Sequence, residues 1–326
     1  MSLVLGLDGG GTKTVCVLMD STGKVLGRGE AGASNYQVVG KQAAVLSIQS
    51  AIIQAVASIE RVKVEAICLG LAGVDRPGDI QVAQSFVEQL KSSTCVPITW
   101  TLPPSNIVIC NDALIALVGG VGHSVGIVAI AGTGSIVFGR NQKGATKRVG
   151  GWGHILGDEG SAYFIAVQGM RAALRAYDGR SSSTSLQESL REHLDLLSVE
   201  NLVEVIYQQR WSVKEIAALA PIVDQAAAAG DEVATAIIED AVKELVTATQ
   251  AVINGIFTQD EVIEIVTTGS VWRGLSLIRE RFVASIVMRS PFAKVIYPRN
   301  EPAYGAGLLA LDTAVRREKF FENNQD

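Results

Sequence analysis

The sequence predicts an α/β protein of two similar lobes, each built in the order β-β-β-α-β-α-β-α. Three short strands with a glycine-rich turn after the first appear near residue 3, and the same arrangement returns near residue 125. Helices and buried strands alternate after both sets, so antiparallel strands lead into a sheet that is otherwise parallel. At 326 residues the chain is also long enough for two hydrophobic cores. We therefore expect a duplicated topology with a ligand-binding cleft between the lobes.

The first lobe is expected to begin with three strands and to continue with helices between further strands. Apolar residues recur at helical spacing over residues 43–59, which predicts a helix there. Another helix is expected over residues 113–118, stopping at Gly119 and Gly120. The strands expected in this lobe are residues 3–7, 14–20, 24–29, 66–71 and 106–110.

The second lobe is expected to repeat the three strands and to carry additional helices. Its expected strands are residues 125–131, 135–139, 146–149 and 262–267. Its expected helices are residues 161–177, 186–197, 199–208, 213–229 and 232–256, with one more from the turn at Gly269 to residue 282. A serine-rich stretch at residues 180–185 is typical of an exposed loop. We assign residues 1–118 and a C-terminal helix, residues 305–326, to the first lobe and residues 119–304 to the second.

Composition excludes several classes of protein. The net charge of −5, without a long Lys/Arg run, argues against a nucleic-acid partner. No stretch of 18 or more apolar residues predicts a membrane span, and the N-terminal residues do not have the pattern of a secretion signal. The four cysteines are scattered and never form a CxxC pair, which favours buried free thiols over zinc or disulfides. We expect a cytoplasmic globular protein, and the sequence leaves a homodimer open.

The first motif that carries chemistry is DGGGTKT, residues 8–14, between two expected strands. Its glycines allow backbone N–H groups to approach a phosphate and permit positive φ. Thr12 and Thr14 add hydroxyl groups, and Asp8 at the strand end can hold Mg²⁺ through water. The motif is neither a Walker A loop nor a dinucleotide fingerprint followed by a helix. A plain glycine hairpin is the alternative.

Two further glycine turns follow expected strands of the second lobe. The run IAGTGS, residues 130–135, occupies the same place in its lobe as the first motif does. Two hydroxyl-bearing hairpins at equivalent places are expected to grip a nucleotide's phosphates from two sides. The run TTGSVW, residues 267–272, ends the last long strand and can lie against an adenosine. An ordinary strand-to-helix turn is its alternative.

Asp112 lies in the run Cys110-Asn111-Asp112, where a strand is expected to end and a helix to begin. Asp and Asn are frequent helix caps, so capping is one interpretation. The other is a general base, because a helix N-terminus favours the carboxylate form. Phosphoryl transfer needs alignment, charge neutralisation and an acceptor for the hydroxyl proton, and one well-placed aspartate can supply the last.

Residues 150–161, GGWGHILGDEGS, predict a loop that meets a ligand with its backbone. Five glycines in eleven residues would cost a core element too much order. Trp152 can pack on a sugar face, while Asp158 and Glu159 can accept hydrogen bonds from sugar hydroxyls. The two acids also precede an expected helix, where they can instead stabilise its N-terminus. His154 has no nearby metal-ligand set and is expected to be structural.

At these five places the sequence resembles the N-acetylglucosamine kinases of the BadF/BadG/BcrA/BcrD ATPase group, in the actin-like ATPase superfamily. DGGGTKT, AGTGS and TTGSVW look like the two phosphate motifs and the adenosine motif. Residues 110–112 and 304–307 resemble the two connecting segments, and residues 150–166 are the most specific match. The resemblance covers residues 5–311 and is weaker over residues 171–258. It implies two ribonuclease H-like lobes with the active site in the cleft.

The resemblance also implies roles for individual residues. Asp112 would be the catalytic base, and Asp8 would contact Mg²⁺ through water. Residues implied to bind the sugar are Asn35, Asp112, Gly151, Trp152 and Asp158. Residues implied to bind ATP are Gly10, Gly11, Thr12, Lys13, Gly132, Thr133, Gly134, Ala227, Gly269 and Ser270.

The implied reaction is phosphorylation of the 6-hydroxyl of N-acetylglucosamine by MgATP. Two departures from the animal enzymes matter: residues 71–75, LAGVD, replace a Ser-Gly-Gly run near the expected acyl group, and Asp8 replaces a glutamate. Glucosamine and N-acetylmuramate therefore stay open as substrates. The same ATPase group includes activators of 2-hydroxyacyl-CoA dehydratases, which hold an iron–sulfur cluster with cysteines. No cysteine lies within residues 120–157, which argues against that alternative.

Overall fold

The computed structural model describes residues 3–60, 62–258 and 260–322. The chain divides into two compact units. Lobe 1 holds the residues up to Val125 and those from Pro298 onward, and lobe 2 holds Gly126–Tyr297. The boundaries expected from the sequence, 118/119 and 304/305, fall inside two helices of lobe 1. The structure places them at 125/126 and 297/298, so lobe 2 is shorter at both ends than expected.

Lobe 1 contains a six-stranded sheet in the order β3-β2-β1-β4-β5, with β6 also paired to β4. The strands are β1 (Leu3–Gly9), β2 (Thr14–Asp20), β3 (Val25–Ala31), β4 (Val62–Leu71), β5 (Ile98–Trp100) and β6 (Ile107–Asn111). The pairs β1–β2 and β2–β3 are antiparallel. The pairs of β4 with β1, β5 and β6 are parallel, so the carboxyl ends of β1, β4 and β6 meet at one edge.

Lobe 2 repeats this plan in a five-stranded sheet of order β11-β10-β7-β8-β9. The strands are β7 (Gly126–Ala131), β8 (Ser135–Arg140), β9 (Thr146–Gly150), β10 (Ile263–Thr268) and β11 (Ala293–Ile296). The first three form antiparallel pairs, and β10 joins β7 in parallel, as β4 joins β1. The two-lobed α/β fold with duplicated topology is therefore confirmed.

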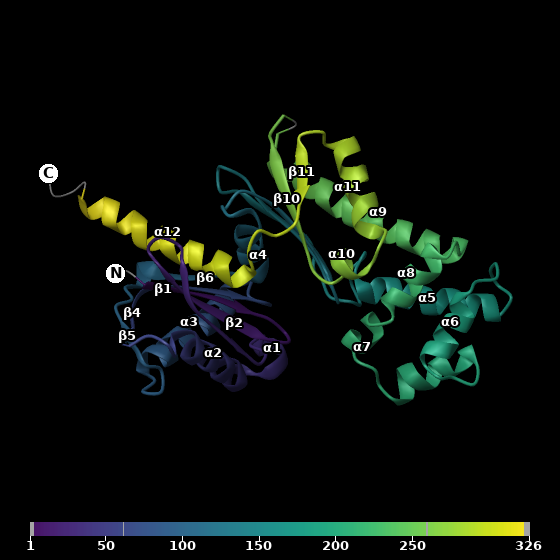
Figure 1. The fold of residues 1–326 in the computed structure, drawn as a ribbon, viewed down its shortest axis with the longest axis horizontal. Helices are drawn as coiled ribbons and strands as arrows, with labels where there is room; N and C mark the ends of the chain where they lie inside the picture. The colour runs from purple at the N-terminus through teal and green to yellow at the C-terminus, as the bar shows by residue number, and fades with distance from the viewer. Residues whose placement is uncertain (1–2, 61, 259, 323–326) are drawn as a thin grey trace. The chain divides into compact units, whose positions relative to one another are not determined.

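Helices cover both faces of the sheet in lobe 1. They are α1 (Tyr36–Val39), α2 (Lys41–Val56), α3 (Pro77–Ser92), α4 (Asp112–Val121) and α12 (Pro302–Glu322). Alternate residues of β1 serve the two faces, because Leu5 and Leu7 pack into the core beneath α2 while Val4 packs into the core beneath α12. Figure 1 shows α12 and α2 on opposite sides of this sheet. Burial on both sides explains the nearly continuous apolar run of β1.

Lobe 2 carries most of the helices. They are α5 (Ala162–Tyr177), α6 (Leu186–His193), α7 (Val213–Ala217), α8 (Ala220–Ala228), α9 (Glu232–Ile256), α10 (Val271–Gly274) and α11 (Ile278–Arg289). The helix expected over residues 199–208 is present as a 3-10 helix at Val199–Asn201 and a π-helix at Glu204–Gln208. The 25-residue helix α9 packs along β8 and β9, and α11 packs on α9.

The expected end of α4 at Gly119 and Gly120 is wrong. The helix continues to Val121 and ends at Gly122, whose φ is +82°. A Cβ on Gly119 would lie 2.5 Å from the carbonyl oxygen of Glu301, and one on Gly305 would lie 2.3 Å from the nitrogen of Gly119. These glycines therefore mark the close crossing of α4 with α12, which the local sequence does not distinguish from a helix stop.

Two other expected helices are interrupted. The helix expected after Gly269 divides into α10 and α11, because the Asp224 carboxylate accepts hydrogen bonds from the backbone N–H (2.9 Å) and hydroxyl (3.0 Å) of Ser276. The helix expected over residues 213–229 divides into α7 and α8, and Pro221 lies in the first turn of α8. Helix α3 and strands β5 and β11 were not located from the sequence.

The cysteines agree only in part with the expectation of buried thiols. Cys16 and Cys68 are buried and Cys110 is partly buried, but Cys95 is exposed, which corrects the prediction for that residue.

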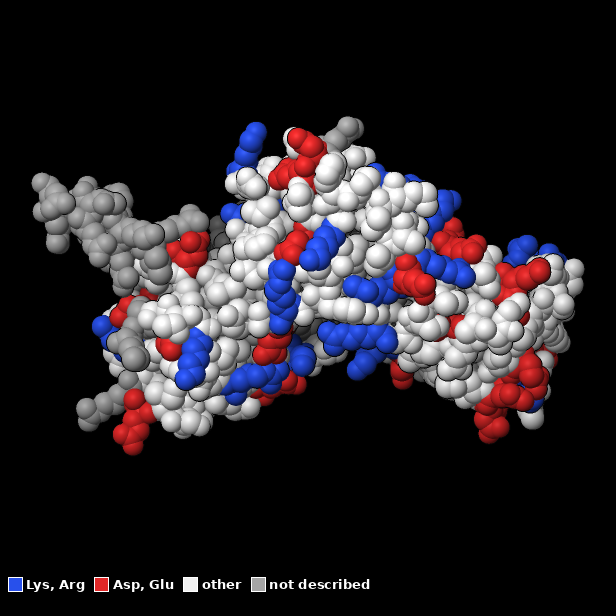
Figure 2. Space-filling model, turned by 45° about the horizontal axis from the view of Figure 1, so that its top comes forward, with Lys and Arg blue, Asp and Glu red and all other residues white. Residues whose placement is uncertain are grey.

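No helix in the described ranges combines the length and the apolarity needed to cross a bilayer. Acidic and basic side chains lie interspersed over the face shown in Figure 2.

Candidate active site

The glycine hairpin of lobe 1 connects β1 to β2. Its turn is closed by the N–H of Gly10, which donates to the carbonyl of Lys13 at 2.9 Å. None of its three glycines has a positive φ, so the conformation they would permit is not used. Gly9 is needed for packing, since a Cβ there would lie 2.4 Å from both Leu71 Cδ2 and Ser34 Oγ. Around Gly11, by contrast, a Cβ would meet nothing within 4 Å, and this exposed glycine leaves its backbone open to a ligand.

Asp8 lies near the carboxyl end of β1, and Asp112 directly follows β6; these two strands flank β4. In the register of the sheet, Asp8 pairs with Gly70 of β4, whose neighbour Leu71 pairs with Asn111 of β6. The pKa of Asp8 is raised to about 7, chiefly by burial and next by the negative charge of Asp112, while Lys13 lowers it. Asp112, more than a hundred residues away in the chain, therefore lies close enough for its charge to raise the pKa of Asp8.

The residues around Asp8 fit a hydrated magnesium ion. Burial and the charges of Asp112 and Glu301 all disfavour an ionised Asp8, and a divalent cation beside it would reverse that balance. Within the described ranges, no group of three or more His, Cys, Asp or Glu side chains is arranged to hold a metal directly. Mg²⁺ usually keeps several waters and binds through one or two carboxylates and the substrate's phosphates. Contact through water, as expected for Asp8, suits this donor set.

Asn111, and not Asp112, is the N-cap of α4. The side-chain oxygen of Asn111 accepts a hydrogen bond from the N–H of Ala113 at 2.7 Å, and its amide donates to Asp75 at 3.1 Å. Asp112 is the first helical residue and partly buried. Capping therefore does not explain Asp112, and the helix N-terminus stabilises its charged form.

Asn35 lies beside the same hairpin. The N–H groups of Ser34 and Asn35 donate to the carbonyl of Gly10 at 3.0 and 3.1 Å. The side chain of Asn35 caps the short helix α1 through the N–H of Gln37, whose own amide donates to the carbonyl of Gly73 at 2.9 Å. The LAGVD run thus borders Asn35, the residue expected to bind the sugar. Gly73 in this run adopts a φ of +81°.

The hairpin of lobe 2 is supported from two sides. The N–H of Gly132 donates to the carbonyl of Gly134 at 2.9 Å, which closes the turn, and Thr133 at its tip is exposed. A Cβ on Gly132 would lie 3.7 Å from both the nitrogen and the hydroxyl of Ser270. A Cβ on Gly269, at a φ of +117°, would lie 2.1 Å from the carbonyl of Ala131. The turn of residues 130–135 and the turn of residues 267–272 therefore pack against each other.

Asp158 reaches the same hairpin from the glycine-rich loop. Its carboxylate would lie 2.7 Å from a Cβ on Gly134, and its own φ is +62°. Burial raises its pKa, while a hydrogen bond from the N–H of Ser135 lowers it. The hydroxyl of Ser135 donates to the carbonyl of Glu159 at 2.7 Å, which fastens the loop to β8.

The rest of the loop exposes its aromatic and apolar side chains. Trp152 is 66% exposed, and the Arg148 guanidinium lies over its ring at 4.8 Å from the centroid. The Arg148 side chain also donates to the carbonyls of Gly150 and Gly151, whose φ values are +76° and +70°. His154 packs edge-on against Tyr163 at 5.0 Å between ring centroids. One face of Trp152 is thus already covered by an arginine, a contact that the sequence did not indicate.

The structure groups most of the expected site residues, lobe by lobe. Asp8, the hairpin, Asn35 and Asp112 gather in lobe 1, while the second hairpin, Asp158 and the Gly269 turn gather in lobe 2. Ala227 is buried in the core of lobe 2 at 7% exposure, so its expected contact with a nucleoside stays a prediction. The expected cleft between the lobes also stays a prediction. Asp75, Arg148 and Glu301 were not singled out from the sequence, although Asp75 lies in the run of residues 71–75 and Arg148 in the strand expected over residues 146–149.

Two repeated α/β lobes, with a glycine-threonine hairpin in each and neighbouring carboxylates at the strand ends of lobe 1, define an ATPase of the actin-like fold. The model of the BadF/BadG/BcrA/BcrD ATPase family matches residues 5–310, and the chain belongs to this family.

Named relatives and solved structures agree with that assignment. The chain is 34% identical over 312 residues to the N-acetylmuramic acid/N-acetylglucosamine kinase of Clostridium acetobutylicum, with 95% of this chain and 98% of that protein covered. It is also 34% identical over 325 residues to the N-acetyl-D-glucosamine kinase of Dictyostelium discoideum, again with 95% and 98% covered.

Among solved structures, a candidate N-acetylglucosamine kinase from Chromobacterium violaceum superimposes with a TM-score of 0.72 at 26% identity, covering 95% of this chain and 99% of that one. A ROK family glucokinase from Streptomyces griseus, in complex with glucose and AMPPNP, shares the fold with a TM-score of 0.54 at 19% identity, covering 95% and 98%.

Proposed function

We propose that this protein transfers the γ-phosphoryl group of ATP to the 6-hydroxyl of N-acetylglucosamine, with Asp112 as the general base. The observation that carries the proposal is the position of Asp112 at the carboxyl edge of the sheet, where it acts on Asp8 and where Asn111 performs the capping. Two full-length relatives named as kinases of N-acetylglucosamine support the substrate class.

The residues of lobe 1 divide the chemistry among them. Asp112 accepts the proton of the attacking hydroxyl at a carboxylate oxygen, while Asn35 holds other hydroxyls of the sugar. The open backbone at Gly11, with Thr12 and Lys13, contacts the phosphates. Magnesium, when bound, neutralises charge on the phosphates, and Asp8 holds it through water. Alignment and charge neutralisation are the main demands of phosphoryl transfer.

The residues of lobe 2 are proposed to bind the nucleotide and to add contacts to the sugar. The hairpin from Gly132 to Gly134 contacts phosphates, and the adjoining Gly269 and Ser270 flank the adenosine with the end of α8 at Ala227. Asp158 accepts hydrogen bonds from the sugar, and the backbone N–H of Gly151 donates one to it. Trp152 packs against the sugar. The burial of Asp158 beside Gly134 supports a role at the junction of sugar and phosphates.

N-Acetylmuramate is a second candidate substrate. It differs from N-acetylglucosamine by a lactyl ether that carries a carboxylate. The guanidinium of Arg148, held over Trp152 in the sugar loop, supplies a positive charge that suits such a group. The relative from Clostridium acetobutylicum is named for both sugars. The expectations of a cytoplasmic location and of a homodimer stay predictions.

A coupled assay of ADP release tests the proposal. N-Acetylglucosamine, glucosamine, N-acetylmannosamine, N-acetylmuramate and glucose would be compared at equal concentration with MgATP. We expect the highest kcat/KM for N-acetylglucosamine, with or without activity on N-acetylmuramate. Activity on no sugar, together with ATP hydrolysis stimulated by a dehydratase, would favour the activator class and overturn the proposal.

A further inference from the structure

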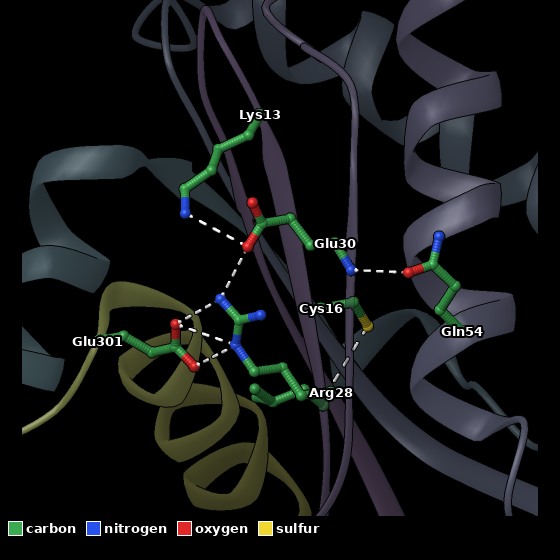
Figure 3. Close-up of polar contacts among 7 residues, drawn as sticks. Lys13, Cys16, Arg28, Glu30, Gln54 and Glu301 are labelled. Carbon is green, nitrogen blue, oxygen red and sulfur yellow. Dashed lines mark hydrogen bonds and ion pairs between the residues drawn. The ribbon is translucent and has the colours of Figure 1, made fainter.

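Lys13, at the end of the lobe 1 hairpin, is held by an acid on the neighbouring strand. Its ammonium lies 3.3 Å from the Oε2 atom of Glu30 on β3, as Figure 3 shows. Lysine is a point charge on a flexible four-carbon stem, so an exposed lysine without such a partner occupies many rotamers. The direction of Lys13 therefore depends on where Glu30 is held.

Glu30 bridges two cations. The Nη2 atom of Arg28 donates to the same Oε2 atom at 3.0 Å, and the backbone N–H of Glu30 donates to Gln54 on α2 at 3.2 Å. The hydrogen bond from Arg28 and then that from Lys13 lower the pKa of Glu30. Glu30 is thus a charged bridge between Arg28 and the hairpin lysine.

Arg28 is in turn fixed by Glu301. Its Nε atom donates to Oε1 at 2.9 Å and its Nη2 atom to Oε2 at 3.1 Å. Two parallel hydrogen bonds to one carboxylate fix the plane of the guanidinium. The backbone before Glu301 is also fixed, because the N–H groups of Arg299 and Asn300 donate to the carbonyls of Gly120 and Gly119 at 3.0 and 3.1 Å.

We propose that Arg28 is a positioning residue of the ATP site. Glu301 holds Arg28, Arg28 holds Glu30, and Glu30 in turn fixes the direction of the Lys13 ammonium. The series joins the C-terminal end of α4 to the hairpin whose lysine contacts the phosphates. Pre-set orientation of a cation lowers the entropy lost when a ligand binds. The inference rests on the proposed contact between Lys13 and ATP.

Simple stabilisation of the surface is the competing explanation. The four side chains are 39% to 54% exposed, and exposed ion pairs contribute little to folding stability. A purely structural role predicts small changes without preference for one substrate. A positioning role predicts a selective loss of ATP affinity.

Steady-state kinetics of Arg28→Gln tests the proposal. We expect the KM for MgATP to rise about threefold to tenfold, while the KM for N-acetylglucosamine and the melting temperature change little. Arg28→Lys keeps the charge but loses the two-point pairing, so its effect should be intermediate. Arg191→Gln is the matched control, because Arg191 is 37% exposed and pairs with Glu188 on α6. An unchanged KM for MgATP in Arg28→Gln would overturn the proposal.

A double variant shows whether Arg28 acts through Lys13. Lys13→Met alone should raise the KM for MgATP, and adding Arg28→Gln should raise it no further. A full additional increase in the double variant would contradict the proposal. If Lys13→Met leaves the KM unchanged, the proposed role of Lys13 itself fails, which is a distinct outcome. Should Arg28→Gln not fold, Glu30→Gln removes the same bridge and should also raise the KM for MgATP. A lower KM for MgATP in Glu30→Gln would mean that Glu30 competes with ATP for Lys13, which would contradict the proposal.

Discussion

The two glycine hairpins occupy equivalent places in duplicated lobes, but their surroundings differ. The hairpin of lobe 1 is surrounded by charges, with Asp8 at its start, Lys13 at its end and Asp112 nearby. The hairpin of lobe 2 rests on the neutral turn at Gly269 and Ser270, with Asp158 as its acidic neighbour. Duplication therefore preserved the backbone that can receive phosphates. The proposed roles assign the acid–base and metal chemistry to lobe 1 and the nucleoside to lobe 2.

The largest effect is expected from Asp112→Asn. Without the base, kcat should fall by about 10²- to 10⁴-fold, while the KM for the sugar changes little because the amide still forms hydrogen bonds. Steady-state kinetics with N-acetylglucosamine measures this. Glu232→Gln, an exposed acid in the first turn of α9, is the control and should keep full activity. Turnover near the wild-type value in Asp112→Asn would contradict the assignment of the general base to Asp112 in lobe 1.

Asp8→Asn tests the charged side of the comparison through folding stability. In the folded protein the pKa of Asp8 is about 7, whereas in the unfolded chain it is near 3.8, so the folded state binds the extra proton between these values. Wild-type stability should therefore fall as pH rises from about 4 to 7 and lose no more above that.

Asparagine does not ionise, so Asp8→Asn should be more stable than wild type at pH 8, by at most about 4 kcal/mol. Urea denaturation from pH 5 to 8, without magnesium or nucleotide, measures the difference. The control is Asp20→Asn, since hydrogen bonds from Thr22 lower the pKa of Asp20 and predict no such gain. A stability difference that does not vary with pH would argue against a raised pKa of Asp8 in the folded protein.

Gly134→Ala and Gly11→Ala compare the two hairpins directly. The new methyl group at 134 would lie 2.7 Å from the Asp158 carboxylate, whereas at 11 it would meet nothing within 4 Å. We expect Gly134→Ala to lower kcat/KM for the sugar by about 10- to 100-fold, because small displacements of substrate-positioning groups are costly. Gly11→Ala should fold normally and affect only the KM for MgATP. Equal effects of both variants on the sugar would contradict the distinction.

The smallest effect is expected from Trp152→Ala. Loss of a stacking surface should raise the KM for N-acetylglucosamine about threefold to tenfold and leave the KM for MgATP nearly unchanged. Tyr207→Ala, an exposed aromatic residue outside the loop, is the control. An unchanged sugar KM in Trp152→Ala would mean that the loop has a structural role only.

Much of the fold was predictable because its signals are local. Alternating or continuous apolar runs located most of the strands, and glycine turns located both hairpins. Strands β5 and β11 escaped because they are only three and four residues long. Helix α3 was overlooked although its buried apolar residues Ala83, Phe86, Val87 and Leu90 recur at helical spacing. The helix division at Ser276 escaped for a different reason, since the interrupting carboxylate of Asp224 comes from another helix.

The sequence by itself determined the duplicated α/β order, the two phosphate-type hairpins and the residues to suspect, because these depend on spacing along the chain. Only the tertiary structure decided that Asn111 caps α4, that Gly119 and Gly305 mark a helix crossing, and that Asp8 and Asp112 share one strand edge. It alone joined Arg28 to Glu301, which lie 273 residues apart. Such contacts depend on how whole strands and helices pack, and no local periodicity records them.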